Sequence, residues 1–336
     1  MESRTIGAAA LEVGAVGLGC MPMTWAYSTS QQDGEESLRT VHAALDRGMT
    51  LLDTADMYGP FTNELLVGRA LKKRRHEAFV STKCGLLVGE QHLVANGRPG
   101  YVKRACDASL RRLQTEVIDL YQLHRADPEV PVEETWGAMA ELVTAGKVRA
   151  LGFCAVGARA DHRGRGAGTG SGIHEVTIRQ LERVQHVFPV SGVQAELSVW
   201  SREALETLLP WCSAHGVGLL AAMPLGNGYL SGTLTTGGGF EPDDVRARHP
   251  RFTAEMMAAN QPVVAGLRRV ARRHGAATPA QVALAWLLAQ GPQVIPVPGT
   301  KKERWAAENG DAAGLVLTAA DMAELGALPP ALGSWE

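Results

Sequence analysis

Short apolar runs alternate along the chain with segments whose apolar side chains follow helical spacing. Most of the runs are continuously apolar, which is typical of strands buried on both faces of a parallel sheet. Eight such runs occur, at 13–19, 50–55, 78–84, 117–124, 148–154, 192–197, 216–223 and 294–299. The pattern therefore predicts eight parallel strands separated by helices.

The intervening segments carry the apolar faces expected of helices that cover such a sheet. Glu133 and Glu134 suit a helix N-terminus, and Pro210 closes a later helical pattern. The apolar positions are Leu38, Val41, Ala44, Leu45, Ala105, Ala108, Leu110, Leu113, Leu142, Leu205, Leu208, Leu209, Val282, Ala285, Trp286 and Ala289. We therefore expect an α/β fold, a (β/α)8 TIM barrel formed by 1–336 as one domain, with an N-terminal β-hairpin at 4–12 capping its bottom.

A doubly wound open sheet is the alternative, and its first strand-to-helix turn normally carries the pattern G-x-G-x-x-G. The glycines present at that point are Gly14, Gly17 and Gly19, which lie inside the first predicted strand. This placement favours the barrel.

One segment, 157–172, is too rich in glycine to form a helix or to bury a core. One interpretation is a surface insertion after the fifth strand. The other follows from its position, because strand-to-helix loops of a barrel lie on the active-site face. Arg159, Arg163 and Arg165 would then close over an anionic substrate or a cofactor.

The composition excludes several classes of protein. The chain has 336 residues and a formal net charge of −2, so it lacks the surplus of basic residues that is typical of nucleic-acid-binding proteins. No apolar run approaches the roughly 18 residues of a membrane-spanning helix. The segment 6–20 is apolar, but Glu2, Glu12 and the lack of a basic start argue against a secretion signal. The five cysteines are odd in number and widely spaced, so we expect neither disulfides nor a metal site. The same cysteine usage favours a reducing compartment, and we therefore expect a cytoplasmic location.

Polar side chains converge where three consecutive predicted strands end. Asp53 ends the second strand, with Tyr58 in the loop that follows, Lys83 ends the third and His124 ends the fourth. Function collects at this face of a barrel. Each residue alone has a structural explanation, as a loop cap, a solvated strand end, a loop anchor or a rim histidine. The four together are typical of a site.

The chemistry that suits these four groups is proton transfer to a carbonyl oxygen. A tyrosine has a pKa near 10, and a neighbouring ammonium lowers this value by stabilising the phenolate. A carboxylate beyond the lysine fixes its charge and direction, and a histidine can orient the carbonyl. Because side chains cannot supply hydride, a nicotinamide cofactor is the natural partner.

The eighth predicted strand leads into a basic segment. Lys301, Lys302 and Arg304 follow the turn after 294–299, and a helical pattern continues to Asn309. Loops after strands seven and eight usually form the phosphate site of such barrels, and the three cations fit an additional 2′-phosphate, hence NADP. A solvated basic helix start is the alternative. The glycine-rich turn 224–230 after strand seven would approach a pyrophosphate.

At these motifs the sequence resembles an aldo-keto reductase, over nearly the whole chain. The resemblance is carried by 52–59 (LDTADMYG), 81–83 (STK), the His124 strand, and 298–300 (PGT) followed by Glu308 and Asn309. The segments 17–21 and 60–64 resemble the bacterial and plant branch that includes pyridoxal reductases and alkaloid-aldehyde reductases.

The resemblance implies an NADP-dependent oxidoreductase in which NADPH reduces an aldehyde or ketone to an alcohol. It implies Tyr58 as the general acid, Lys83 and Asp53 as the pair that tunes it, and His124 as the residue that orients the substrate. The cofactor residues that we expect are Gly19, Cys20, Met21, Asp53, Cys154, Gln194, Met223, Pro224, Leu225, Gly226, Gly228, Gly299, Thr300, Lys301, Lys302, Glu308 and Asn309. A small carbonyl substrate would contact Trp25, Tyr58, His124 and Arg125, with Met57, Trp200 and 229–252 as further candidate walls.

The sequence departs from the family pattern around the expected nicotinamide site. Cys154 and Ala155 replace the usual Ser-Asn or Ser-Glu, Met223 replaces a tyrosine that stacks on the nicotinamide, and Asn227 replaces an arginine. Two further hypotheses therefore stay open. One is a tailoring enzyme of a biosynthetic pathway with altered carbonyl or enoyl chemistry. The other is a weakly catalytic NADP-binding regulatory module. The sequence does not indicate an oligomeric state.

Overall fold

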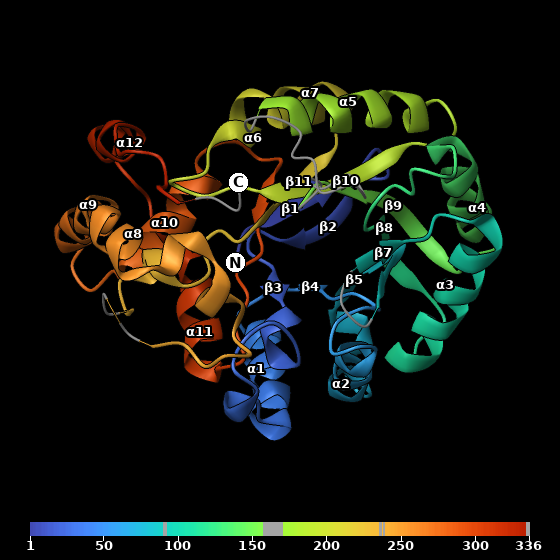
Figure 1. The fold of residues 1–336 in the computed structure, drawn as a ribbon, viewed down its shortest axis with the longest axis horizontal. Helices are drawn as coiled ribbons and strands as arrows, with labels where there is room; N and C mark the ends of the chain where they lie inside the picture. Colours follow the sequence, from blue (N-terminus) through green and yellow to red (C-terminus); the bar gives the residue numbers. More distant parts are fainter. Residues whose placement is uncertain (90–92, 157–170, 235–236, 238, 334–336) are drawn as a thin grey trace.

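Eight parallel strands curl into a closed barrel at the centre of the protein (Figure 1). The structure is a computed structural model, and it describes residues 1–89, 93–156, 171–234, 237 and 239–333. In chain order the barrel strands are β3 (Leu18–Gly19), β4 (Leu51–Asp53), β5 (Phe79–Cys84), β8 (Ile118–Leu123), β9 (Val148–Cys154), β10 (Val190–Glu196), β11 (Gly218–Ala222) and β12 (Val294–Pro296). The strands lie side by side in that same order, as the alternation of runs predicted.

The first and last strands close the barrel. A parallel bridge joins Gly19 to Gly299, and the Gly17 amide donates to the Pro296 carbonyl at 2.9 Å. An ideal Cβ on Gly19 would lie 3.1 Å from the Gly299 backbone, so the closure depends on a close backbone approach. The predicted (β/α)8 barrel is confirmed.

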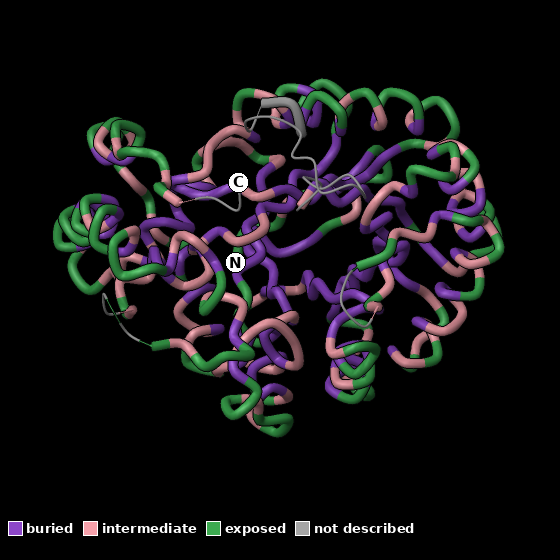
Figure 2. The backbone as a smooth tube through the Cα atoms, in the orientation of Figure 1, coloured by how far each residue is buried: buried purple, intermediate pink, exposed green. Residues whose placement is uncertain are grey.

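Helices cover the outer face of the barrel and bury its strands (Figures 1 and 2). They are α1 (Gly34–Asp46), α2 (Thr62–Leu71), α3 (Pro99–Leu113), α4 (Val132–Thr144), α5 (Ser171–Gln185), α6 (Glu203–Glu206), α7 (Leu208–His215), α8 (Ala254–Ala259), α9 (Gln261–Arg273), α10 (Pro279–Leu288), α11 (Glu303–Asp311) and α12 (Ala319–Gly326). In Figure 2 the strands are buried, whereas exposed positions gather on the outer sides of the helices. No helix among the described residues is both long and apolar enough to cross a membrane.

An N-terminal hairpin closes the bottom of the barrel, as expected from 4–12. It consists of β1 (Ser3–Ile6) and β2 (Leu11–Gly14). Ile6 packs into the apolar interior formed by Leu51, Leu120 and Ile295. The Arg4 guanidinium donates to backbone carbonyls that precede β12, including that of Leu288 at 2.8 Å. The bottom is therefore sealed, which leaves the opposite end of the barrel for a site.

The structure differs from the predicted elements in three places. The predicted strand 13–19 is divided, because Val13 and Gly14 belong to the hairpin and only Leu18–Gly19 enters the barrel. Pro210 does not end a helix; it lies in the first turn of α7, where a missing amide hydrogen costs little. A second hairpin, β6 (Leu86–Val88) and β7 (Leu93–Ala95), follows β5 and was not predicted. Of the predicted insertion 157–172, residues 157–170 lie outside the described residues, and α5 begins at Ser171.

Candidate active site

A buried lysine joins an acid and a tyrosine at the carboxyl ends of β4 and β5. The Lys83 Nζ donates to Asp53 Oδ2 at 2.6 Å, to the Thr54 carbonyl at 2.9 Å and to the Tyr58 hydroxyl at 3.4 Å. Lys83 is fully buried, so its charge has no solvent partner. Three of the four side chains that the sequence predicted to converge, Asp53, Tyr58 and Lys83, therefore form one hydrogen-bonded group.

The register of neighbouring strands explains why Asp53 is held in place. Asp53 lies opposite Ser81 on β5, and Lys83 lies opposite Gln122 on β8. The second carboxylate oxygen, Asp53 Oδ1, accepts from Ser81 Oγ at 3.0 Å and from Gln122 Nε2 at 3.1 Å. Both oxygens of the buried carboxylate are thus hydrogen-bonded, which fixes the direction of the lysine.

The environment of Tyr58 keeps its hydroxyl protonated. Burial raises the pKa of Tyr58 to about 12, although the Lys83 ammonium acts in the opposite direction. Burial alone would lower the pKa of Lys83, but Asp53, Tyr58 and Cys154 together outweigh it, and the pKa of Lys83 lies above its usual range. The expected lowering of the tyrosine pKa is therefore not found, because desolvation is the larger effect. The resulting phenol is a proton donor at neutral pH.

His124 faces Tyr58 from the end of β8. Its ring meets the Tyr58 ring edge-on, with 6.1 Å between the ring centroids and an interplanar angle of 85°. Burial, together with the charges of Lys83 and Arg125, holds the pKa of His124 well below its usual range. The imidazole is therefore neutral, and its buried Nδ1 has no partner among the described residues.

A cavity of about 460 Å³ opens above these residues at the mouth of the barrel. Asp53, Tyr58 and His124 line it, and so do Lys301 and Lys302. Cys154 and Gln194 also line it, with Cys154 Sγ 3.7 Å from Gln194 Oε1. A small molecule in this cavity reaches the tyrosine and the histidine at the same time.

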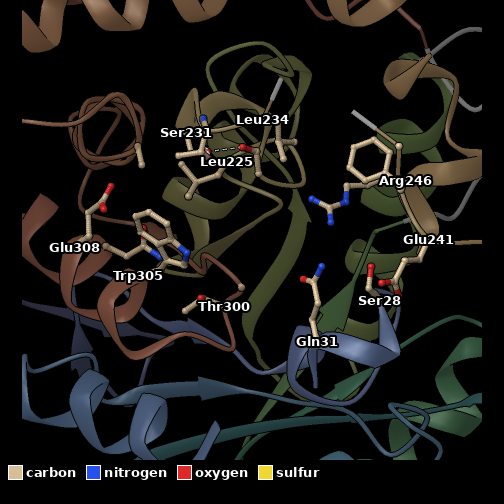
Figure 3. Close-up of a pocket in the computed structure, with 17 residues that line it drawn as sticks. Ser28, Gln31, Leu225, Ser231, Leu234, Glu241, Arg246, Thr300, Trp305 and Glu308 are labelled. Carbon is tan, nitrogen blue, oxygen red and sulfur yellow. Dashed lines mark hydrogen bonds between the residues drawn. The ribbon is translucent and has the colours of Figure 1, made fainter. Parts of the chain in front are cut away.

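A second cavity, of about 510 Å³, adjoins the first (Figure 3). Gln31, Arg246 and Trp305 line both cavities, and Figure 3 shows their side chains projecting into the shared space from three sides. Glu308 and Asn309 line the second cavity and not the first. We call the two cavities together the elongated site; Tyr58 and His124 line its first cavity, and residues of α11 line its second.

The predicted cofactor residues mostly line this elongated site. The first cavity is lined by Gly19, Met21, Asp53, Cys154, Gln194, Met223, Pro224, Leu225, Gly228, Gly299, Thr300, Lys301 and Lys302, and the second adds Glu308 and Asn309. Cys20 and Gly226 are absent from both linings. Cys20 is buried below the surface, and Gly226 packs against Trp200, where a Cβ would lie 2.3 Å from the indole ring.

The predicted substrate residues divide into two groups. Tyr58 and His124 line the first cavity, whereas Trp25 and Arg125 line neither. Trp25 packs against a small apolar cluster that contains Met57, Tyr58 and Leu86, so it supports the tyrosine from outside the cavity. Arg125 follows His124 directly and is half-buried.

Sequence reasoning named 229–252 as a candidate wall but missed the contact of its residues 244–246 with 26–28, which bridges the two sides of the elongated site. Tyr27 lines the first cavity and lies 4.9 Å beneath the Arg246 guanidinium. The buried Asp244 pairs with Arg246 at 2.8 Å and accepts from Ser28 Oγ at 3.1 Å. The Val245 amide donates to the Ala26 carbonyl at 2.7 Å. More than 200 residues separate 26–28 from 244–246, so no local pattern indicated the contact between the two segments.

The departures from the family pattern lie at the lining of the first cavity. Met223 follows β11 with a φ of 49°, an unusual conformation for a side chain of this size. Asn227 also has a positive φ, of 54°, and its carbonyl accepts from Arg246 Nη1 at 3.5 Å. Arg246 thus brings a cation beside the position at which the family usually has an arginine.

The fold and the site define a barrel enzyme with a lysine-tyrosine-carboxylate group at the mouth of the barrel. The model of the Aldo/keto reductase family matches residues 15–329. A probable aldo-keto reductase of Glycine max is 35% identical over 322 residues, which cover 95% of this chain and 86% of that protein. The chain therefore belongs to the aldo/keto reductase family and is an oxidoreductase.

Solved structures agree with this assignment. A glycerol dehydrogenase of Gluconobacter oxydans is 29% identical with a TM-score of 0.80, covering 96% of this chain and 93% of that chain. An aldo-keto reductase of Klebsiella pneumoniae, solved in complex with NADPH, is 26% identical with a TM-score of 0.70, covering 98% and 96%. An aldo-keto reductase of Bacillus halodurans is 27% identical with a TM-score of 0.75, covering 100% and 99%.

Proposed function

We propose that this protein reduces an aldehyde or a ketone to an alcohol with NADPH, and that Tyr58 is the general acid. The observation that carries the proposal is the contact of the Tyr58 hydroxyl with the buried Lys83–Asp53 pair, at a cavity that His124 also lines. The NADPH-bound relative from Klebsiella pneumoniae supports the choice of cofactor.

The residues of the elongated site fit a dinucleotide phosphate. Lys301, Lys302 and Arg246 place cations along it, and cations are what a diphosphate and a 2′-phosphate require. Lys302 Nζ is held by Glu36 at 2.6 Å, and Lys301 Nζ approaches the Ser28 carbonyl at 3.4 Å. Glu308 and Asn309 offer polar partners for an adenine in the second cavity. When bound, NADPH supplies the hydride that no side chain can provide.

The protein's own residues supply the proton and the orientation. The neutral His124 ring donates a hydrogen bond to the substrate carbonyl oxygen and turns that oxygen towards Tyr58. Tyr58 gives its proton to the same oxygen as negative charge develops there. Lys83 then stabilises the phenolate through the 3.4 Å contact, and Asp53 keeps the lysine charged and aimed at the tyrosine.

Replacement of Tyr58 tests the proposal. Tyr58→Phe keeps the ring and removes the proton, so kcat for NADPH-dependent reduction of a panel of aldehydes and ketones should fall about 10²- to 10⁴-fold. The Kd for NADPH should stay within about twofold, because the hydroxyl is not needed to hold the phosphates.

Tyr121→Phe is the matched control. The Tyr121 hydroxyl is buried and lines neither cavity, so its loss should leave kcat unchanged. Full activity of Tyr58→Phe would remove the proposed acid. Tight NADPH binding by the wild-type protein, with no carbonyl turned over, would instead favour a regulatory module.

A further inference from the structure

Arg125 is a half-buried cation for which no partner is found among the residues that the structure describes. It follows His124 at the end of β8, and its Nε is buried and unbonded. No carboxylate among the described residues pairs with its guanidinium. A buried N–H group without an acceptor costs free energy comparable to a lost hydrogen bond, and more when the group is charged.

The other half-buried arginines show that this protein otherwise satisfies such groups. Within the described residues, each of them donates to a carboxylate or to a backbone carbonyl. These are Arg4, Arg74, Arg75, Arg112, Arg202, Arg246 and Arg251. Arg125 is the exception, and it is also the one next to His124. This contrast marks Arg125 as the half-buried arginine for which the described residues of the chain supply no acceptor.

Arg125 lies beside the reacting end of the site and away from the expected phosphate end. Its charge acts on both His124 and Cys154, and both of these line the first cavity with Tyr58. Lys301 and Lys302 follow β12, which three strands separate from β8 in the sheet order. Arg125 therefore lies on the side of the barrel mouth that carries His124, away from Lys301 and Lys302.

We propose that the substrate is a carbonyl compound that also carries a carboxylate, and that Arg125 binds this carboxylate at the edge of the cavity beyond His124. The inference rests on the proposed carbonyl reduction and names its substrate class. A carboxylate suits the site because the planar guanidinium can donate two parallel hydrogen bonds to it. The carboxylate takes no part in the reaction, so the product is the corresponding hydroxy acid.

The test compares paired aldehydes that differ in one charge. 4-Carboxybenzaldehyde is matched with 4-methylbenzaldehyde, and 4-oxobutanoate with butanal, each with the wild-type protein and with Arg125→Met and Arg125→Lys. The wild-type kcat/KM should be higher for the carboxylate of at least one pair. Arg125→Met should reduce kcat/KM for that carboxylate about 10- to 100-fold, mainly through KM, and change its neutral partner less than twofold. Arg125→Lys should restore part of the preference.

Arg104→Met is the matched control for loss of one positive charge, because Arg104 is exposed on α3 and remote from both cavities. An equal loss for both members of each pair in Arg125→Met would overturn the inference and assign Arg125 to packing around His124. A wild-type protein that reduces neutral aldehydes and shows no preference for carboxylates would overturn it as well.

A binding measurement separates this inference from the proposed function. The Kd of benzoate, compared with that of benzamide, is measured on the NADPH-loaded wild-type protein and on Arg125→Met. Tighter benzoate binding that Arg125→Met abolishes supports the carboxylate site even if no aldehyde is reduced. Equal binding of benzoate and benzamide would count against the site, whatever the outcome for carbonyl reduction.

Discussion

Asp56 carries a buried carboxyl group that should make the stability of the protein depend on pH. It lies in the loop that presents Tyr58 and is 2% exposed. Its Oδ2 accepts from the Tyr101 hydroxyl at 3.4 Å, and its Oδ1 is buried without a partner among the described residues. Burial, reinforced by the nearby Glu64 carboxylate and only partly offset by Arg112, raises the pKa of Asp56 to about 7.

The sign and size of the effect follow from linkage between proton binding and folding. The folded-state pKa lies above the ordinary value of 3.8, so between the two values the folded protein binds the proton more tightly than the unfolded chain. The proton therefore stabilises the fold fully below about pH 4, and this stabilisation is lost as the pH rises through about 7. Between about pH 5 and about pH 8 the loss amounts to about 3 kcal/mol.

Asp56→Asn removes this titration while keeping the shape of the side chain. The difference in free energy of unfolding between the variant and the wild-type protein should shift by about 3 kcal/mol in favour of the variant from about pH 5 to about pH 8. Reversible urea unfolding, followed by fluorescence and by circular dichroism at several pH values, measures it.

Asp46→Asn is the control, because Asp46 is an exposed carboxylate that pairs with Arg74 at 2.7 Å. A constant difference between Asp56→Asn and the wild-type protein across this range would show that Asp56 is ionised throughout, and would refute the reasoning. A shift of equal size in Asp46→Asn would assign the effect to net charge.

Two further predictions concern the cofactor site and the turn after β11. Arg246 lines both cavities, at the place where the diphosphate of a dinucleotide would pass, so Arg246→Met should weaken the binding of NADPH and NADH alike, by about 10-fold. Lys302→Met should weaken the binding of NADPH more than the binding of NADH. The measurement is the ratio of the Kd values for NADPH and NADH. This division of roles would be contradicted if Lys302→Met left that ratio unchanged or if Arg246→Met changed it. Gly226 has a φ of 53°, and a Cβ there would lie 2.3 Å from the Trp200 ring, so Gly226→Ala should lower the free energy of unfolding by more than about 2 kcal/mol. Gly137→Ala is its control in urea unfolding, since a Cβ there meets open space.

The barrel and the group of polar residues at its mouth could be predicted from the sequence because both depend on local sequence patterns. Buried parallel strands appear in the sequence as apolar runs, and Asp53, Lys83 and His124 lie at the ends of three of these runs. Consecutive strands of a barrel are neighbours in space, so polar residues at their ends must meet at one rim. Asp53 pairs with Ser81 in this register, and Lys83, two residues further along β5, reaches Asp53 with its ammonium at 2.6 Å.

The contacts between the two segments that bridge the elongated site could not be predicted in the same way. Tyr27, Ser28, Asp244 and Arg246 come together only because the segment after η4 (Tyr229–Ser231) returns across the loop before α1. Neither segment has a period that indicates a partner, and their contacts span more than 200 residues. The pKa of Tyr58 was missed for a related reason, because desolvation depends on everything that packs around the ring.

The protonation of Tyr58 bears on the direction in which the proposed site works best. A hydroxyl with a pKa of about 12 stays protonated across the neutral range, so the resting site is ready to give a proton and not to remove one. Oxidation of an alcohol would need the phenolate first, and the Lys83 ammonium offsets only part of the cost of forming it in this buried position. Lys83 is therefore more useful after proton donation than before it, since it stabilises the phenolate that reduction leaves behind. On this argument the arrangement around Tyr58 favours proton donation to a carbonyl at neutral pH, and the rate of alcohol oxidation should rise with pH.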